Sequence, residues 1–442
     1  MRIMKQIVIV FLLGSMFVDG QSNQAMLSLN DAIQKALVNR YDLKIQKTST
    51  KITEKQLSEV GTRSLPQVSS DLDVRYNSQL QTNILPGSIL GSPNAPNKEV
   101  QFGTKYNTLW SLNLNQQLFN PVNLSDRKIA NIQSEYQRQN EKLTEINIKQ
   151  DVTEAYFTTL LWKEKVDLSA ENVKRAQEVY QVTQNQLSNA QATQYDVQRN
   201  LIDVENAKAT DEQNKNNYKL SINDLLYKIS DDSIKNPILT DKITDFIQAF
   251  SLIPKDNEEI KRTELTQEKI QLEIYKLNMK KQSLTYLPTL SVYGNYSLQY
   301  LNNDFTPFTS KNWYPFNYFG VKASIPIFDG GLKAKTRQEY ELRSEMSKFN
   351  YNKLSRDFKQ EVQSTQTALN NALSDLTYQK KNLSLIEDLY KIDTERLKNG
   401  AIKQSDLTTT YYTLQQTQTN YLNSVYNYLV AVVRYKKAAG LL

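Results

Sequence analysis

The chain has 442 residues and contains neither cysteine nor histidine, which excludes disulfides, thiol nucleophiles and zinc sites built from those residues. It contains 12 glycines and 11 prolines, about half of their usual frequencies, and so few turn-forming residues predict long uninterrupted helices or strands. Its formal net charge of +7 is a mild, dispersed excess that favours a solvated surface over a nucleic-acid site.

The segment 1–20 has the form of a secretory signal peptide. Arg2 and Lys5 precede an apolar run at 7–13, and Val18 and Gly20 occupy the positions before a cleavage site. Cleavage after Gly20 lowers the net charge from +7 to +6, because two basic residues and one acidic residue are removed. No later segment reaches the apolar length of a membrane-spanning helix, so a place in a membrane would require strands.

The rest of the chain is an internal duplication. The segment DLKIQKTSTKITEKQLSEVGTRSLP begins at Asp42 and matches ELTQEKIQLEIYKLNMKKQSLTYLP from Glu264, at an offset of 222 (264 − 42). Farther on, Asp196 matches Asp406 at an offset of 210 (406 − 196), because the first copy carries a longer loop, LQTNILPGSILGSPNAPNKEVQ. The sequence therefore predicts two structural repeats, 21–229 and 258–442, joined by an inter-repeat segment at 230–257.

Each repeat is expected to fold as helix, strand, loop, strand, long helix, turn and helix. In the first repeat the periodicity predicts helices at about 31–61, 124–187 and 196–229, and strands at about 67–77 and 106–119. In the second repeat it predicts helices at about 258–285, 332–397 and 406–439, and strands at about 289–300 and 317–328. The fold class is thus mixed and mainly α.

The strands alternate apolar and polar residues, as Val68, Leu72 and Val74 do against Ser69 and Asp71. Their lengths are close to the roughly 9–11 residues that cross a bilayer as a tilted strand. Four strands cannot close a membrane barrel, since single-chain barrels need about eight. A membrane role for these strands therefore requires several copies of the chain.

The long helices carry a seven-residue apolar repeat, which is typical of coiled coils. Each has about 65 residues, or roughly 100 Å, and the short helices are about half as long. The repeat positions in the first long helix are Val173, Ala176, Tyr180, Thr183 and Leu187, and those in the second are Leu383, Ile386, Tyr390, Asp393 and Leu397. The turns at Asn189-Ala190 and Asn399-Gly400 are then the hairpin tips of antiparallel coiled coils. Gly400 and Asn399 are suited to left-handed backbone. Ser405 or Asp406 can cap the returning helix by accepting its free N–H groups.

These features together resemble the TolC family of outer membrane efflux and secretion ducts. The resemblance covers nearly the whole mature chain and rests on the duplicated order. Its supporting stretches are LSLNDAIQKAL, the paired Leu-Pro strand starts, the strand ends QLFNP and PIFDGG, the tip residues Arg396, Gly400 and Asp406, and the terminal AVVRYKKAAG.

The resemblance implies a homotrimer with a 12-stranded outer membrane β-barrel and a helical barrel of twelve struts crossing the periplasm. Its partners would be outer membrane lipid, a periplasmic adaptor protein and an inner membrane pump. Such a duct has no catalytic residues, metal or cofactor, and it binds no nucleic acid. The transported substrate is decided by the pump.

Family tips contain the narrowest aperture, which is lined by acidic residues. The resemblance places Asp196 and Asp406 there, with helix capping by these residues or Ser405 as the alternative role. It places Asn189, Ala190, Arg396, Asn399 and Gly400 at the adaptor-facing tip.

This chain departs from the better-known members at the tip. Leu397 stands where they carry a gating tyrosine, Ile402 where they carry an arginine, and Thr409 replaces a second aspartate. We therefore expect an apolar or weaker constriction of Leu397 and Ile402, with Lys403 as a substitute charge.

Two other classes of function are less consistent with the sequence. A periplasmic or surface coiled-coil structural protein would explain the seven-residue repeats, but not two pairs of bilayer-length strands at matching places. An enzyme lacks support, because no convergent set of catalytic residues is present.

Overall fold

A computed structural model describes residues 26–90, 96–231, 233–249, 261–309, 311–399 and 401–442. The expected signal peptide at 1–20 and the tip residue Gly400 lie outside the described residues. The chain forms two compact units. The hairpin unit takes its described residues from 1–40, 148–254 and 369–433, and the sheet unit from 41–147, 255–368 and 434–442. Each unit therefore combines matching parts of both sequence repeats.

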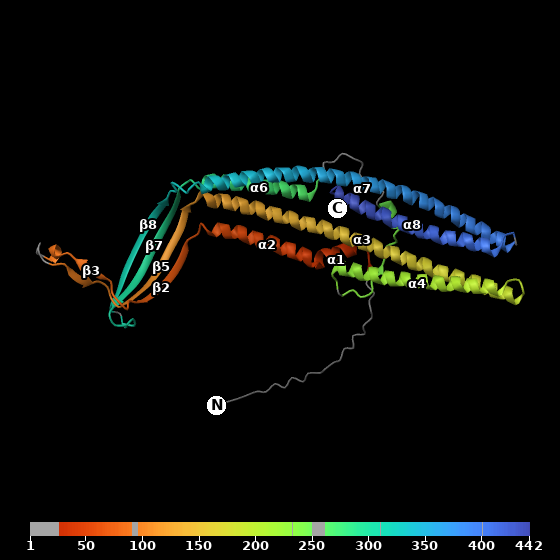
Figure 1. Cartoon of the computed structure of the whole chain (residues 1–442), viewed down its shortest axis with the longest axis horizontal. Coiled ribbons are helices and arrows are strands. Elements are labelled where there is room, and N and C mark those ends of the chain that lie inside the picture. The colour runs from red at the N-terminus through yellow and green to blue at the C-terminus, as the bar shows by residue number, and fades with distance from the viewer. Residues whose placement is uncertain (1–25, 91–95, 232, 250–260, 310, 400) are drawn as a thin grey trace, which may run out of the picture. The chain divides into compact units, whose positions relative to one another are not determined.

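The sheet unit contains a four-stranded antiparallel sheet (Figure 1). Its strand order is β2 (Gln67–Tyr76), β5 (Tyr106–Phe119), β7 (Thr289–Asn302) and β8 (Trp313–Ser324). Each repeat supplies one pair of strands, and the central β5–β7 pairing joins the repeats. Among the described residues, β2 and β8 each have only one paired edge.

One face of this sheet is apolar and open. Residues that pair directly across antiparallel strands share a face, and the register aligns Leu72 with Trp110 and Trp110 with Leu298. The side chains on this face include Val68, Leu72, Val74, Tyr76, Leu112, Leu114, Tyr296, Phe319 and Val321. Leu72 is 65% exposed and Phe319 is 91% exposed. An apolar surface of this kind needs a partner or a lipid environment.

The opposite face is mainly polar over β2, β5 and β7, where side-chain hydrogen bonds link the strands, whereas β8 places Tyr314, Phe316 and Tyr318 on it. Asn113 Nδ2 donates to Asp71 Oδ2 over 2.8 Å, and Asn295 Nδ2 donates to Asn113 Oδ1 over 2.7 Å. This chain of contacts crosses β2, β5 and β7. The sheet thus separates an apolar from a polar environment, as the period-two alternation predicts.

Two features of the strands differ from the sequence prediction. The last strand ends at Ser324 instead of extending to about 328, because its partner β7 begins at Thr289 and pairs that residue with Ser324. The first-repeat loop contains a short hairpin of β3 (Thr82–Leu85) and β4 (Lys98–Gln101), with a 3-10 helix at Gly87–Leu90 between them.

The helices of the sheet unit are α2 (Tyr41–Thr62), α6 (Thr263–Leu284) and the adjoining parts of α3 (Pro121–Ser188) and α7 (Leu332–Lys398). Polar contacts join them. Thr50 Oγ1 donates to Glu141 Oε2 over 2.9 Å, and Asp126 pairs with Lys281 at 2.5 Å and with Arg63 at 3.3 Å. Large apolar side chains on α7 remain outside this packing, since Leu342 is 65% and Phe349 is 64% exposed.

The helix predicted at about 31–61 is two helices, α1 (Leu29–Asn39) and α2. Ser28 and Asp31 form a reciprocal capping box, so α1 starts slightly earlier than expected. At Arg40 the backbone leaves the helix (φ −59°, ψ 128°), and the guanidinium pairs with Asp151 at 3.3 Å. Likewise α6 begins at Thr263, and the earlier part of the helix expected from 258 lies mostly outside the described residues.

The hairpin unit has its own core around α3, α4 (Gln194–Ile229) and α8 (Gln404–Ala438). Its fully buried side chains include Tyr156, Phe157, Leu160, Leu225, Ile229, Val425 and Leu429. Tyr156 Oη donates to both Leu27 O and Asp241 Oδ2, over 2.9 and 2.8 Å, and burial raises the pKa of this phenol. These bonds tie the inter-repeat segment to α3.

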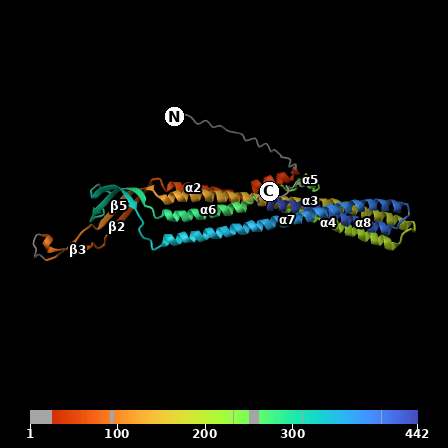
Figure 2. The same cartoon turned by 90° about the horizontal axis from the view of Figure 1, so that it is seen from above.

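The inter-repeat segment also contributes β6 (Ile238–Leu239), which pairs in parallel with β1 (Met26–Leu27), and α5 (Asp245–Ala249). In both views the hairpin α3–α4 lies alongside the hairpin α7–α8 within this unit (Figures 1 and 2). Over the described residues, no helix is sufficiently long and apolar to cross a membrane.

Candidate functional site

The first hairpin tip connects α3 to α4 through a tight turn. Ala190 adopts left-handed backbone with φ 56°, and Gln191 N donates to Gln186 O over 2.8 Å. This bond returns to the last turn of α3 in the manner of a Schellman C-cap. Asn189 and Ala190, both predicted as tip residues, therefore form the turn itself, and Ala190 rather than Asn189 takes the left-handed conformation.

The second tip repeats the same hydrogen bond at the equivalent place of the second repeat. Ala401 N donates to Arg396 O over 2.8 Å, and Asn399 N donates to Glu395 O over 3.1 Å. Helix α7 ends at Lys398 and α8 begins at Gln404. The left-handed position predicted for Gly400 lies outside the described residues.

Asp196 occupies the third position of α4 and completes a capping box with Thr193. Thr193 N donates to Asp196 Oδ2 over 2.9 Å, while Asp196 N donates to Thr193 Oγ1 over 3.2 Å. Hydrogen bonds from the Thr193 side chain, and then from its backbone, hold the pKa of Asp196 below its usual value. Sequence reasoning missed Thr193, although the spacing Thr-x-x-Asp before a helix is the signal of such a box.

Asp406 makes only half of this arrangement. Lys403 N donates to Asp406 Oδ2 over 3.2 Å, but Lys403 has no side-chain oxygen to return a bond. Ser405 Oγ contacts Asp406 Oδ1 at 3.4 Å and does not act as the N-cap. Helix α8 starts at Gln404, and Lys403 O accepts the first backbone bonds, so Asp406 accepts a free N–H from within the first turn of the helix.

Just above each tip, a polar pair joins the two helices of the hairpin. Asn200 Nδ2 donates to Thr183 Oγ1 in the first hairpin, and Thr410 Oγ1 donates to Asp393 Oδ2 at the equivalent place in the second, both over 2.7 Å. Thr183 and Asp393 are the polar members of the predicted seven-residue repeats. Arg396 lies 3.7 Å from Asp393, so the predicted tip arginine supports this pair.

The three residues predicted to lie at the constriction differ in the exposure of their side chains. Leu397 and Ile402 are half-buried, whereas Lys403 is exposed. Leu397 lies at the last position of the seven-residue repeat before the turn.

A cavity of about 260 Å³ lies between the two hairpins of this unit. Its lining includes three tyrosines, Tyr390, Tyr411 and Tyr412, whose neighbouring ring centroids are 6.1 and 5.9 Å apart. Tyr411 Oη donates to the backbone and side-chain oxygens of Asn172, each over 3.2 Å. Since Asn172 is on α3 and Tyr411 on α8, this contact joins the two hairpins.

Burial raises the pKa of Tyr411 to about 12, so its hydroxyl remains a hydrogen-bond donor at neutral pH. Burial, followed by a hydrogen bond with Asp203 and the charge of that group, also raises the pKa of Tyr412. Tyr412 is on α8 and Asp203 on α4. The sequence analysis placed Tyr390 in the seven-residue repeat but did not predict the hydrogen bonds of Tyr411 and Tyr412, because helical tyrosines at such spacing are more often part of a packed interface.

An amphipathic sheet combined with long helical hairpins defines the class of outer membrane duct subunits. The chain belongs to the outer membrane efflux protein family, whose model matches residues 32–227 and 258–441. It is therefore a component of an outer membrane efflux duct that extends into the periplasm, and this family is a class of channels and not of enzymes.

Solved structures share the fold. CusC is 15% identical with a TM-score of 0.74, covering 96% of this chain and 95% of that chain. The CmeC outer membrane channel of Campylobacter jejuni is 16% identical with a TM-score of 0.71, covering 93% and 85%. VceC of Vibrio cholerae is 14% identical with a TM-score of 0.69, covering 93% and 96%. No curated protein sequence matches the chain significantly.

Proposed function

We propose that three copies of this chain close a 12-stranded barrel in the outer membrane. The observation that carries this proposal is the open apolar face of the sheet together with the single paired edges of β2 and β8. In lipid, an unpaired strand edge costs several kcal/mol for each unsatisfied group. Pairing β2 of one copy with β8 of the next removes every edge, and the apolar face then contacts outer membrane lipid.

The helical hairpins would form the periplasmic part of the same duct, with twelve struts around one bore. Exposed apolar residues on α7, such as Leu342 and Phe349, would be covered by a neighbouring copy. The segment 1–20 would direct export and be removed. The two sequence repeats, 21–229 and 258–442, would then form equivalent segments of the barrel wall, joined by 230–257.

The hairpin tips are proposed to meet a periplasmic adaptor protein and an inner membrane pump, which supplies the energy. The adaptor-facing residues are Asn189, Ala190, Arg396, Asn399 and Gly400. Asp196 and Asp406 would line the aperture while also accepting hydrogen bonds from the backbone at the starts of α4 and α8. The half-buried Leu397 and Ile402 would narrow the bore, with Lys403 as a nearby charge.

The closed tip would be held by Tyr411 rather than by a residue at position 397. Leu397 has no hydroxyl, whereas Tyr411 Oη reaches Asn172 on the other hairpin. Opening the aperture by moving one hairpin away from the other would break this contact.

The proposal is tested by purifying the full chain from outer membranes in mild detergent and measuring its mass and its conductance in planar bilayers. A mass of three chains together with stepwise conductance is expected. Recovery as a soluble periplasmic monomer would instead favour a coiled-coil structural protein.

A further inference from the structure

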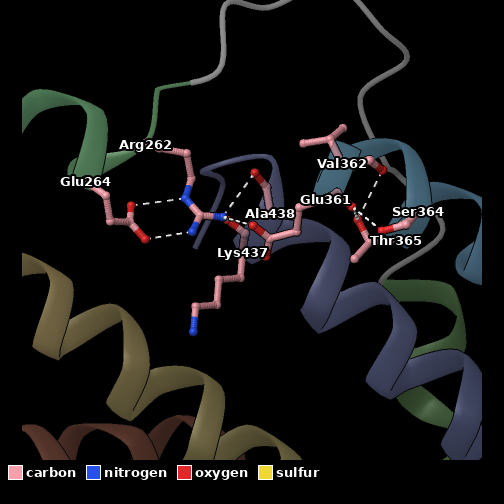
Figure 3. A network of polar contacts seen from close by, with 8 residues as sticks. All are labelled: Arg262, Glu264, Glu361, Val362, Ser364, Thr365, Lys437 and Ala438. Atoms are coloured by element: carbon pink, nitrogen blue, oxygen red, sulfur yellow. Dashed lines mark hydrogen bonds and ion pairs between the residues drawn. The ribbon is translucent and has the colours of Figure 1, made fainter. Parts of the chain in front are cut away.

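Arg262 lies at the centre of a polar network in the sheet unit (Figure 3). Its side chain is only 7% exposed, and it directly precedes α6. Nε and Nη2 donate to the two carboxylate oxygens of Glu264 over 3.1 and 2.6 Å, in the forked geometry that arginine favours. Nη1 lies 3.4 Å from Glu361 on α7, and the guanidinium lies 4.2 Å from the ring centre of Phe358.

The same guanidinium also receives the end of α8. Nη1 donates to Lys437 O over 3.2 Å and to Ala438 O over 3.4 Å. The last carbonyls of a helix lack intrahelical partners and carry partial negative charge. Arg262 therefore satisfies the C-terminus of α8 while its other two nitrogens bind the first turn of α6.

The residues that follow α8 lie close to Lys261, which directly precedes Arg262. Gly440 adopts left-handed backbone with φ +73°, and a Cβ there would come within 2.8 Å of Lys261 O. Gly440 N and Leu441 N donate back to the last turn of α8, over 3.0 and 2.8 Å. Only glycine permits both this backbone conformation and this close approach.

The first repeat carries equivalent residues at the offsets of the duplication. Arg40 corresponds to Arg262 (262 − 40 = 222), and Asp151 corresponds to Glu361 (361 − 151 = 210). Arg40 Nη1 lies 3.3 Å from Asp151 Oδ2, which matches the pairing of Arg262 with Glu361. Ser230 holds the place of Gly440 in the first repeat (440 − 230 = 210), and it is the left-handed C-cap of α4, with φ 54°.

We propose that Arg262 is a splice residue, which fixes the end of the returning helix α8 to the start of α6 and to α7. Arg40 holds the corresponding place in the first repeat through Asp151. The role goes beyond the duct function, because each contact lies within one chain and does not depend on the number of copies. Without the arginine, Ala438 O would lose this donor, Lys437 O would keep the Gly440 N–H, and Glu264 would lose its bidentate partner.

The absence of cysteine from the chain allows a local test. Ala438 and Ala36 are both fully buried, and Ala36 O accepts the backbone N–H of Arg40. Ala438→Cys and Ala36→Cys therefore give one reporter for each arginine. In the full-length protein in detergent, Arg262→Met is expected to speed maleimide labelling of the cysteine at position 438 at least tenfold and leave that at position 36 unchanged.

The matched variant Arg40→Met is expected to leave labelling at position 438 unchanged. Arg262→Lys should give an intermediate rate, because lysine retains the charge but not the planar fork. Equal acceleration at both reporters, or none at position 438, would overturn the splice role. If Ala438→Cys does not fold, hydrogen exchange of the Ala439 and Gly440 amides in the cysteine-free protein provides the same readout. None of these outcomes bears on whether the chain forms a duct.

Discussion

The N-cap residues of the two returning helices differ in chemistry, and this difference permits a matched test. Thr193 makes three hydrogen bonds with Asp196, two of them through Oγ1, whereas Lys403 only donates its N–H to Asp406. Thr193→Ala removes both hydrogen bonds made by Oγ1 and should destabilise the first turn of α4 by about 1 kcal/mol. That change corresponds to roughly fivefold faster hydrogen exchange at the Asp196 amide.

Lys403→Thr should have the opposite effect, because it completes the capping box of α8. Slower exchange of the Asp406 amide is expected, with exchange at Asp196 unchanged. A Lys403→Thr variant that exchanges faster at Asp406 would show that the lysine itself stabilises the turn.

Glu264 makes stability depend on pH. Burial alone would raise the pKa of Glu264, but hydrogen bonds from Arg262 and its charge outweigh burial and lower the pKa below the ordinary value of 4.5. A carboxyl with a lowered pKa in the folded state stabilises the fold above its unfolded pKa. This contribution is lost as the pH falls from 4.5 through the folded pKa.

The expected result is a fall in the thermal midpoint below pH 4.5 that becomes shallower in Glu264→Gln. Glu387→Gln, which changes an exposed carboxylate on α7, serves as the control and should retain the wild-type slope. If the thermal midpoint of Glu264→Gln falls with pH as steeply as that of the wild type, Glu264 does not contribute to the pH dependence of stability.

At the scale of elements, the two faces of the sheet predict opposite responses to charge. Leu72 lies near the middle of β2 on the apolar face, while Ser69 lies on the polar face of the same strand. A charged residue facing lipid at the midplane costs about 2–4 kcal/mol. Leu72→Arg should therefore reduce the amount of assembled protein in outer membranes, whereas Ser69→Arg should assemble normally.

Quantitative immunoblotting of membrane fractions, with and without heating to dissociate oligomers, measures both variants. Normal assembly of Leu72→Arg would contradict the assignment of this face to lipid.

The elements that could be predicted from the sequence are those with a strong period. The alternation around Leu72 and the seven-residue repeat ending at Leu397 follow from the geometry of strands and helices. The end of β8 at Ser324 could not be predicted, because it depends on the pairing register that aligns Ser324 with Thr289 at the start of β7. The break at Arg40 was also missed, since it depends on Asp151, which is distant in sequence.

Some features of the hairpin tips could also be predicted from the sequence, and others could not. The positions of the tips followed from Asn189 and Asn399, where helical periodicity is interrupted. The N-cap residue Thr193 was missed, although the spacing Thr-x-x-Asp is a readable signal of a capping box. The contact of Tyr411 with Asn172 could not be found from one sequence, because it joins helices from different repeats.

For the whole molecule, the duplication explains why matched sites recur with different chemistry. Asn200–Thr183 and Thr410–Asp393 hold equivalent places in the two hairpins, as do Arg40 and Arg262 in the helical segments. Each repeat supplies its own polar pair and its own arginine at these positions. Among the described residues, the contact of Tyr411 with Asn172 has no such copy, because Leu201 stands at the place of Tyr411 in the first repeat (411 − 210 = 201).

Tyr411 joins the two hairpins near the tip of the proposed duct. Its hydroxyl donates to Asn172 on α3, accepts from Gln415 within α8, and lies in a cavity between the hairpins. A contact that crosses from one hairpin to the other is broken when the hairpins separate. We therefore expect the Tyr411 hydroxyl to favour the closed arrangement of the tip.

Tyr411→Phe removes this hydroxyl and keeps the ring, so it isolates the closing contact. A hydrogen bond contributes about 0.5–1.5 kcal/mol, and the population of open tips should rise by up to roughly tenfold. Single-channel recording in planar bilayers is expected to show longer or more frequent open states. Tyr378→Phe, which alters a 66% exposed tyrosine on α7, controls for loss of a hydroxyl elsewhere and should behave as wild type. Equal open probabilities in Tyr411→Phe and wild type would place the closing contact elsewhere at the tip, with Leu397 and Ile402 as the next residues to vary.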